Sequence, residues 1–182
     1  MRFRYIGPDG NRAIAVAGVP GDPSVAYIGA ASGGLWKTED MGFNWKPVFD
    51  KTDDSSIGAI ALAPADPDQV WIGTGETFLI RPAHAVGNGV YKSSDAGKTW
   101  KNMGLKSTFR ISRVLVHPTD TNIVYVASLG HAHGPQQERG VYKTTDGGKN
   151  WERVFFLNEQ TGCSDLPSIQ KIRISCMLPC GR

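Results

Sequence analysis

The chain has 182 residues, a formal net charge of +3 and charges that are scattered along its length rather than gathered in runs. This length is sufficient for one domain with a hydrophobic core, and the scattered charges give little support for nucleic-acid binding. No apolar run approaches the length of a membrane span, and the first residues contain no signal-peptide hydrophobic region. The 22 glycines indicate turn-rich β structure.

Three units with the same order of strands and turns follow one another over residues 12–50, 56–105 and 110–157. Each unit begins with a short apolar strand, passes through a turn rich in Pro and Asp, and enters a second apolar strand. The predicted first strands cover residues 14–19, 57–62 and 111–116, and the predicted second strands cover 25–29, 70–73 and 123–127. A loop, a third strand and a fourth strand that begins at a Trp complete each unit. This order predicts an all-β fold with the four-stranded blades of a β-propeller and no helix of useful length.

The third strand of each unit ends in one ten-residue pattern, aromatic-Lys-(Ser/Thr)-x-Asp-x-Gly-x-(Asn/Thr)-Trp. An Asp followed by x-Gly favours a turn, because the carboxylate accepts backbone N–H groups and Gly tolerates positive φ. The Trp restarts a strand and supplies a large apolar ring. The residues that we assign to this structural role are Asp40, Gly42, Trp45, Asp95, Gly97, Trp100, Asp146, Gly148 and Trp151.

This pattern resembles the Asp-box, or bacterial neuraminidase (BNR) repeat, of sialidases, sortilin-type propellers and many bacterial propeller proteins. Over residues 1–166 the chain also resembles bacterial proteins with sortilin-like N-terminal propellers, through the segments 19–23 and 29–38 and the three turns. The resemblance implies a fragment of about three four-stranded blades whose ring does not close within the chain. It also implies a structural role for the three Asp residues, a module that binds protein, peptide or carbohydrate, and relatives that are often exported.

The loops between the second and third strands are the first candidates for a binding surface. Alternate turns of a four-stranded blade lie on opposite faces, so we expect these loops to lie opposite the Asp turns. The loops at residues 74–89 and 128–140 are the longest, and long loops on rigid β scaffolds commonly carry function. The candidate binding residues are Glu76, Arg81, His84, Asn88, His131, His133, Glu138 and Arg139.

The alternative function is that of a glycoside hydrolase fragment, sialidase-like or xyloglucanase-like, that lacks most of its active site. Glycoside hydrolysis needs two carboxylates across one site, and the sequence does not place two of the loop acids opposite each other. The xyloglucan-cleaving propellers, which the blades resemble, carry an Asp in the loop after the second strand. The first unit has Ala-Ala-Ser-Gly at residues 30–33 instead, so we assign no catalytic residue and favour a binding module over an enzyme.

Metal and cofactor binding have little support. His131 and His133 could place two imidazoles on one side of a strand and bind zinc with Glu138. No third ligand has the fixed spacing of a zinc site, and a polar surface loop explains the pattern better, so we predict no metal and no cofactor. The three cysteines, Cys163, Cys176 and Cys180, also lack the spacing of a metal site.

The repeat ends near residue 166, after the expected start of a fourth unit at 163–166. Codons can be chosen for residues 167–182 that restore the strand–turn–strand pattern in another reading frame, so we interpret this segment as a frameshifted tail. A natural, irregular tail is the alternative. We expect a strand at residues 3–6 to complete the last blade of a closed ring. Three blades leave open strand edges, which predict marginal stability or self-association.

Overall fold

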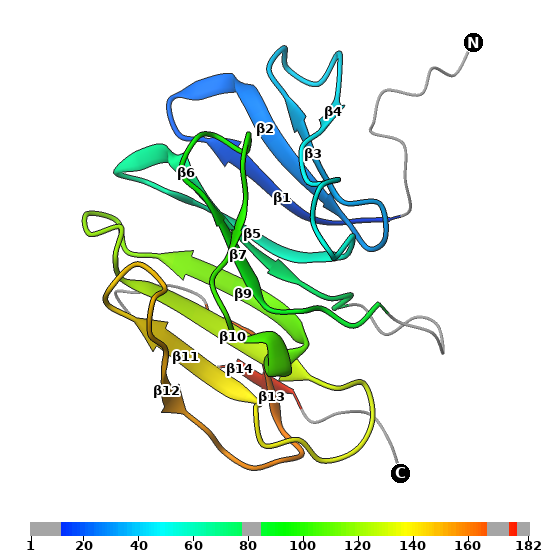
Figure 1. Cartoon of the computed structure of the whole chain (residues 1–182), viewed down its shortest axis with the longest axis vertical. Coiled ribbons are helices and arrows are strands. Elements are labelled where there is room, and N and C mark those ends of the chain that lie inside the picture. Colours follow the sequence, from blue (N-terminus) through cyan, green and yellow to red (C-terminus); the bar gives the residue numbers. More distant parts are fainter. Residues whose placement is uncertain (1–11, 78–84, 167–174, 178–182) are drawn as a thin grey trace.

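The computed structural model describes residues 12–77, 85–166 and 175–177. Three antiparallel sheets of four strands lie one after another (Figure 1). The first sheet contains β1 (Ala13–Val19), β2 (Asp22–Ala30), β3 (Leu35–Thr38) and β4 (Lys46–Pro47). The second contains β5 (Ile57–Ala63), β6 (Asp66–Thr74), β7 (Val90–Ser93) and β8 (Lys101–Asn102). The third contains β9 (Arg110–Val116), β10 (Val124–Gly130), β11 (Gly140–Thr144) and β12 (Glu152–Phe155).

The strand order within each sheet follows the chain, so each sheet is a simple meander. This arrangement confirms the predicted fold class, a propeller fragment of three four-stranded blades whose ring is not closed within the described residues. We refer to the sheets as blades 1, 2 and 3. Each fourth strand begins one residue after the Trp at which it was predicted to begin.

Two smaller elements complete the described structure. A 3-10 helix, η1 (Lys106–Thr108), connects blades 2 and 3, and a two-stranded sheet joins β13 (Gly162–Asp165) to β14 (Ser175–Met177). Strand β14 belongs to the segment that we interpret as frameshifted, whose other residues, 167–174 and 178–182, lie outside the described residues. The expected strand at residues 3–6 also lies outside them. The frameshift and the blade boundaries therefore stay predictions.

The hydrophobic core lies between the blades rather than within a single sheet. One cluster between blades 1 and 2 includes Tyr27, Ile57 and Ile72, and a second between blades 2 and 3 includes Trp71 and Ile111. All five side chains are fully buried. Because each blade buries its surface against the next blade, a blade depends on its neighbours for stability.

Glycines on the second strands allow adjacent blades to approach closely. A Cβ atom at Gly29 would lie 2.5 Å from Cγ2 of Ile57, and one at Gly73 would lie 2.3 Å from Cγ2 of Ile111. Both distances are far shorter than a normal contact between carbon atoms. The same device therefore brings the first strand of blade 2 against blade 1 and the first strand of blade 3 against blade 2.

The turn tryptophans also connect consecutive blades. The indole N–H of Trp100 donates to the carbonyl of Val48 at 2.6 Å, and that of Trp151 donates to the carbonyl of Met103 at 2.7 Å. Each acceptor follows the corresponding Trp of the preceding blade by three residues. The indole thus anchors the outer part of each blade to the blade before it.

Candidate binding site on the loop face

The three Asp turns lie at one end of the blades. Asp95 accepts hydrogen bonds from the hydroxyl of Ser93 and from the backbone N–H and hydroxyl of Thr99, at 2.6–2.8 Å. Asp40 and Asp146 accept equivalent bonds from Thr38 and Asn44 and from Thr144 and Asn150. Both oxygens of each carboxylate are used inside its own turn. These turns offer no carboxylate oxygen that lacks a local hydrogen-bond donor.

The hydrogen bonds stabilise the charged form of each turn carboxylate. Donation by the side chain and backbone of Thr99 lowers the pKa of Asp95 to about 2. Donation by the backbone and side chain of Asn44 lowers the pKa of Asp40, and Asn150 lowers that of Asp146 in the same way. An acid whose pKa lies this low is a poor proton donor near neutral pH.

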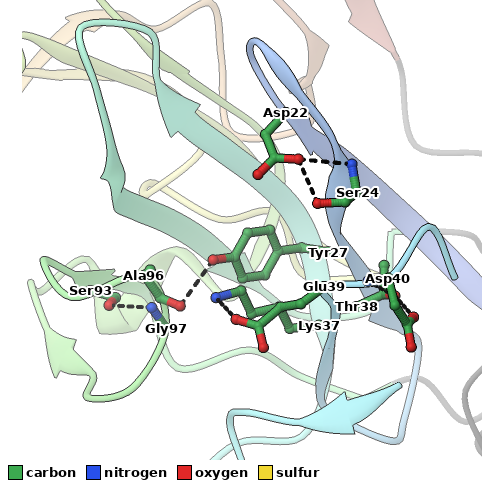
Figure 2. A network of polar contacts seen from close by, with 10 residues as sticks. All are labelled: Asp22, Ser24, Tyr27, Lys37, Thr38, Glu39, Asp40, Ser93, Ala96 and Gly97. Atoms are coloured by element: carbon green, nitrogen blue, oxygen red, sulfur yellow. Dashed lines mark hydrogen bonds and ion pairs between the residues drawn. The ribbon is translucent and has the colours of Figure 1, made fainter. Parts of the chain in front are cut away.

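Each Asp turn is also bonded to the first turn of its own blade. The N–H of the residue after the Asp donates to a carbonyl beside that turn, from Met41 to Ser24 near the start of β2, from Ala96 to Asp68 near the start of β6 and from Gly147 to Asn122 in the β9–β10 turn, at 2.9–3.0 Å. Figure 2 shows the first two Asp turns with Tyr27, whose hydroxyl donates to the carbonyl of Ala96 at 2.9 Å. We call this end of the blades the turn face and the opposite end the loop face.

Of the eight candidate binding residues, two have an unexpected position. The side chains of Glu76 and Arg139 are each only 1% exposed, whereas a surface loop was expected. Asn88, His131 and Glu138 are half-buried, His133 is exposed, and Arg81 and His84 lie outside the described residues. Their role in binding remains a prediction.

Glu76 closes the base of the blade 2 loop. Its carboxylate forms an ion pair with Arg12, which precedes β1, and its N–H donates to the carbonyl of Ala85 at 2.9 Å. Near the other end of the loop, the N–H of Asn88 donates to the hydroxyl of Thr74 at 2.8 Å. These bonds fix both ends of the loop to the blade.

A second arginine, which the sequence did not single out, lies beside Arg139 on blade 3. Arg110 is 4% exposed, and its guanidinium donates to the carbonyls of Gly130 and His131 at 2.7 and 2.6 Å. Arg139 donates to the carbonyls of His131 and Gly134 at 3.2 and 2.9 Å. The only sequence signal for Arg110 was a charged residue at the start of a short apolar strand.

The two guanidinium groups are close enough to affect each other. Burial lowers the pKa of Arg110 to about 10, with a further contribution from the positive charge of Arg139. Burial also lowers the pKa of Arg139. Within the described residues, neither arginine forms an ion pair with a carboxylate.

A pocket of about 110 Å³ lies where the loops of blades 2 and 3 meet. Blade 2 contributes Ala85 and Val86, and blade 3 contributes Phe109, Arg110, Gly130, His131 and Ala132. The rings of Phe109 and His131 lie 4.0 Å apart, between centroids. The pocket therefore combines an arginine, an aromatic pair and two loops that were predicted to carry function.

Neither a metal-binding cluster nor a membrane-spanning helix is present in the part of the chain that the structure describes. There, no group of three or more His, Cys, Asp or Glu side chains is arranged to hold a metal ion. No helix in this part is long and apolar enough to span a membrane.

Comparison with curated proteins finds xyloglucanases. The chain is 32% identical over 100 residues to a probable oligoxyloglucan-reducing end-specific xyloglucanase of Neosartorya fischeri, covering 52% of this chain and 10% of that protein. It is 28% identical over 152 residues to a xyloglucanase of Hypocrea jecorina, covering 74% of this chain and 17% of that protein. The chain thus spans less than a fifth of the length of either relative.

Solved structures and a family model agree on the fold. An ancestral GH74 enzyme matches with a TM-score of 0.63 and 28% identity, over 81% of this chain and 19% of that one. YCF48 bound to D1 peptide matches with a TM-score of 0.61 over 94% of this chain and 56% of that one, but its 13% identity shows likeness of fold alone. The family model described as "Sortilin, neurotensin receptor 3" matches residues 33–173. Because this match covers most of the three blades, the chain belongs to the sortilin (Vps10) family.

Proposed function

We propose that the chain is a non-catalytic part of a propeller, and that it binds a protein, peptide or glycan through its loop face. The observation that carries this proposal is the pocket at which the blade 2 and blade 3 loops meet. The turn face, by contrast, is occupied by three hydrogen-bonded turns, which we propose to be Asp-box repeats. Function on rigid β scaffolds is commonly found in loops of variable length.

A glycan is the best supported of the three ligand classes. The curated relatives named above are xyloglucanases, and a solved GH74 enzyme shares the fold at 28% identity. The likeness to YCF48 does not favour a peptide, because its identity is too low to carry an argument about ligands. A shared polysaccharide surface without shared hydrolysis is consistent with the way folds host different functions.

The relatives also support a second candidate, a fragment of a glycoside hydrolase. Hydrolysis requires a pair of carboxylates that reach the scissile bond. Glu76 is buried and paired with Arg12, and residues 30–33 contain no acid. Asp54, on the same face, accepts the N–H of Ser56 at 2.8 Å, and burial raises its pKa. These features favour binding over hydrolysis.

The test is calorimetric titration of the chain with xyloglucan oligosaccharides. Ala132→Phe fills the pocket and should weaken binding about tenfold or more, as expected when about 1.4 kcal/mol or more of binding free energy is lost. Ala65→Phe is the matched control, because Ala65 is exposed in the β5–β6 turn on the turn face. Equal loss in both variants would contradict a loop-face site. Hydrolysis of the oligosaccharides that is abolished by Glu76→Gln would establish the enzyme instead.

We also propose that the chain self-associates through its open strand edges. On blade 1, Val16 is 73% exposed on β1 and Met41 is 71% exposed in the Asp turn. In blades 2 and 3 the residues at the position of Met41 are Ala96, which is half-buried, and Gly147, which is buried, each against the preceding blade. Sedimentation measures the oligomeric state, and thermal unfolding measures cooperativity. A monomer that unfolds in one cooperative transition would contradict this proposal.

A further inference from the structure

We propose that Arg110, supported by the neighbouring Arg139, forms a binding site for a carboxylate group, carried by an acidic saccharide. This inference deepens the proposed function, and it rests on that function for the saccharide. The carboxylate itself is inferred from the contacts of the two arginines.

The two arginines are buried charges that form no ion pair with a carboxylate among the described residues. Both side chains are at least nine-tenths buried, and together they place two like charges in one region of low solvent access. Burying a charge without a partner is costly, and a second like charge nearby increases this cost. A bound anion would neutralise the pair and remove much of that cost.

The hydrogen bonds of the pair leave two guanidinium donors unused. Within the described residues, the hydrogen bonds of the two guanidinium groups go to the backbone carbonyls of Gly130, His131 and Gly134. Nη1 of Arg110 and Nε of Arg139 are buried and have no hydrogen-bond partner in the described part of the chain. Buried donors of this kind are rare in folded proteins and call for an explanation.

The surrounding backbone is held in a fixed and strained form. Phe109, directly before Arg110, has a φ of 57°, which is unusual for a residue with a bulky side chain. The amide side chain of Gln136 accepts the N–H of His131 and donates to the carbonyl of Ser107 at 2.6 Å. A strained residue within a rigid hydrogen-bonded loop is typical of sites that are organised before the ligand binds.

The chemistry of the site favours a carboxylate. A guanidinium is planar and presents paired N–H donors that match the two oxygens of a carboxylate. The pocket of about 110 Å³, which Arg110 lines, has room for a small group rather than for a whole sugar chain. Its Phe109 and His131 rings provide an apolar surface on which a sugar ring can lie. An acidic sugar satisfies both requirements at once.

A purely structural role for the arginines makes a different prediction. If Arg110 and Arg139 only tie the blade 3 loop to β9, small carboxylates should not bind and acidic and neutral sugars should behave alike. The two explanations can therefore be separated by comparing D-galacturonate with D-galactose. These probes differ only at C6, which is a carboxylate in D-galacturonate and a hydroxymethyl group in D-galactose.

The experiment is titration of the chain with each probe at constant ionic strength. Binding is measured by calorimetry and by the change in the melting temperature of the chain. We expect galacturonate to bind and raise the melting temperature, and galactose to do neither. Arg110→Gln keeps hydrogen-bond donors but removes the charge, and it should weaken galacturonate binding about tenfold or more. Arg113→Gln is the matched control, because Arg113 lies on the same strand with its side chain 49% exposed.

Arg110→Gln could also disturb folding, so Ala132→Phe provides an independent test. It blocks the pocket without removing either arginine, and it should abolish galacturonate binding while leaving the melting temperature without ligand unchanged. Galacturonate binding that survives both substitutions, or equal binding of galactose, would overturn the inference.

Further outcomes separate this inference from the proposed function. If neutral xyloglucan oligosaccharides bind and galacturonate does not, the loop face binds glycans and the carboxylate site is wrong. If galacturonate binds but oligosaccharides rich in galacturonate do not, the carboxylate site stands and the glycan proposal fails. A third outcome is that a peptide with a free C-terminal carboxylate binds more tightly than its amide, while acidic sugars do not bind. This outcome would overturn the inference that the ligand is an acidic saccharide.

Discussion

The interface between blades 1 and 2 and the interface between blades 2 and 3 use the same positions but different chemistry. At the first, the hydroxyl of Tyr27 on β2 donates to the carbonyl of Ala96 in the next Asp turn. At the second, Trp71 occupies the corresponding position on β6, and a Cβ atom at Gly148 would lie 2.8 Å from its ring. The indole N–H of Trp71 has no hydrogen-bond partner in the described structure. One interface therefore uses a polar contact where the other uses only packing.

This difference indicates that the repeat is maintained by shape rather than by one particular hydrogen bond. In both blades a Lys of the turn pattern lies over the aromatic ring, Lys37 at 5.7 Å from the centre of Tyr27 and Lys92 at 5.0 Å from a ring centre of Trp71. Both rings are fully buried against the following turn. The following predictions test whether the two interfaces are equivalent.

The largest effect is expected from Trp71→Ala. Removing a fully buried indole should lower the free energy of unfolding by about 3–5 kcal/mol, because the site loses apolar contacts and leaves a cavity. The edge-to-face contact with Trp151, at 6.3 Å between ring centres, would also be lost. Denaturant unfolding measures the change, and Val16→Ala, at a side chain that is 73% exposed, is the control. A loss below about 1 kcal/mol would show that the second interface contributes little.

A smaller loss is expected from Gly73→Ala and, equally, from Gly29→Ala. The new methyl group would overlap Ile111 or Ile57, and overpacking of this kind costs about 1–3 kcal/mol. Gly18→Ala is the matched control, since a Cβ atom there meets no atom within 4 Å. Unfolding experiments on the three variants should give two similar losses and one small change. Unequal losses at Gly29 and Gly73 would show that the two interfaces differ in how closely the blades approach.

Tyr27→Phe should have a still smaller effect. It removes the hydrogen bond to Ala96 but keeps the ring, so the expected loss is about 1 kcal/mol. Tyr125→Phe, at the same position of blade 3, is the control, because no hydrogen bond from that hydroxyl is present in the described residues. If both substitutions had the same effect on the urea midpoint, the polar contact of the first interface would not contribute to stability.

The Asp turns predict a dependence of stability on pH. The folded pKa of Asp95, about 2, lies below the ordinary value of 3.8, so the folded state favours the ionised carboxylate. Its contribution is fully present above pH ~4 and is lost as the pH falls towards 2. Melting temperatures between pH 7 and pH 2 should therefore fall below pH 4. Asp95→Asn should make this decline shallower, whereas Ser94→Ala, at an exposed neighbour in the same turn, should not. Parallel declines in all three proteins would contradict the assignment.

The blades and their turns could be predicted because their determinants are local. Each Asp bonds to residues within four positions in the sequence, and the following x-Gly pair provides positive φ angles, as at Ala96 and Gly97. Apolar strands that are joined by such turns then pair with their neighbours in chain order, as an antiparallel meander. The start of each fourth strand was misplaced by one residue; in blades 2 and 3 the Trp directly before the strand turns its indole towards the preceding blade.

The loop face could be predicted only in part. Its two long loops were identified from their length, but the burial of Glu76 and Arg139 and the presence of Arg110 were not. Glu76 is paired with Arg12, and Arg110 is bonded to Gly130, so the partners lie on different strands or different blades. No periodic pattern in the sequence records such contacts.

The amino-acid sequence by itself thus determined the repeated unit, since hydrogen bonds within each turn and the alternation of strand residues act over a few positions. The tertiary structure alone decided which charged side chains are buried and that one of them, Arg110, lines a pocket. That outcome depends on how closely the blades pack, which Gly29 and Gly73 set through contacts with residues of the next blade. Burial then gives the two arginines their electrostatic character, because the energy of a charge depends on its surroundings more than on its position in the chain.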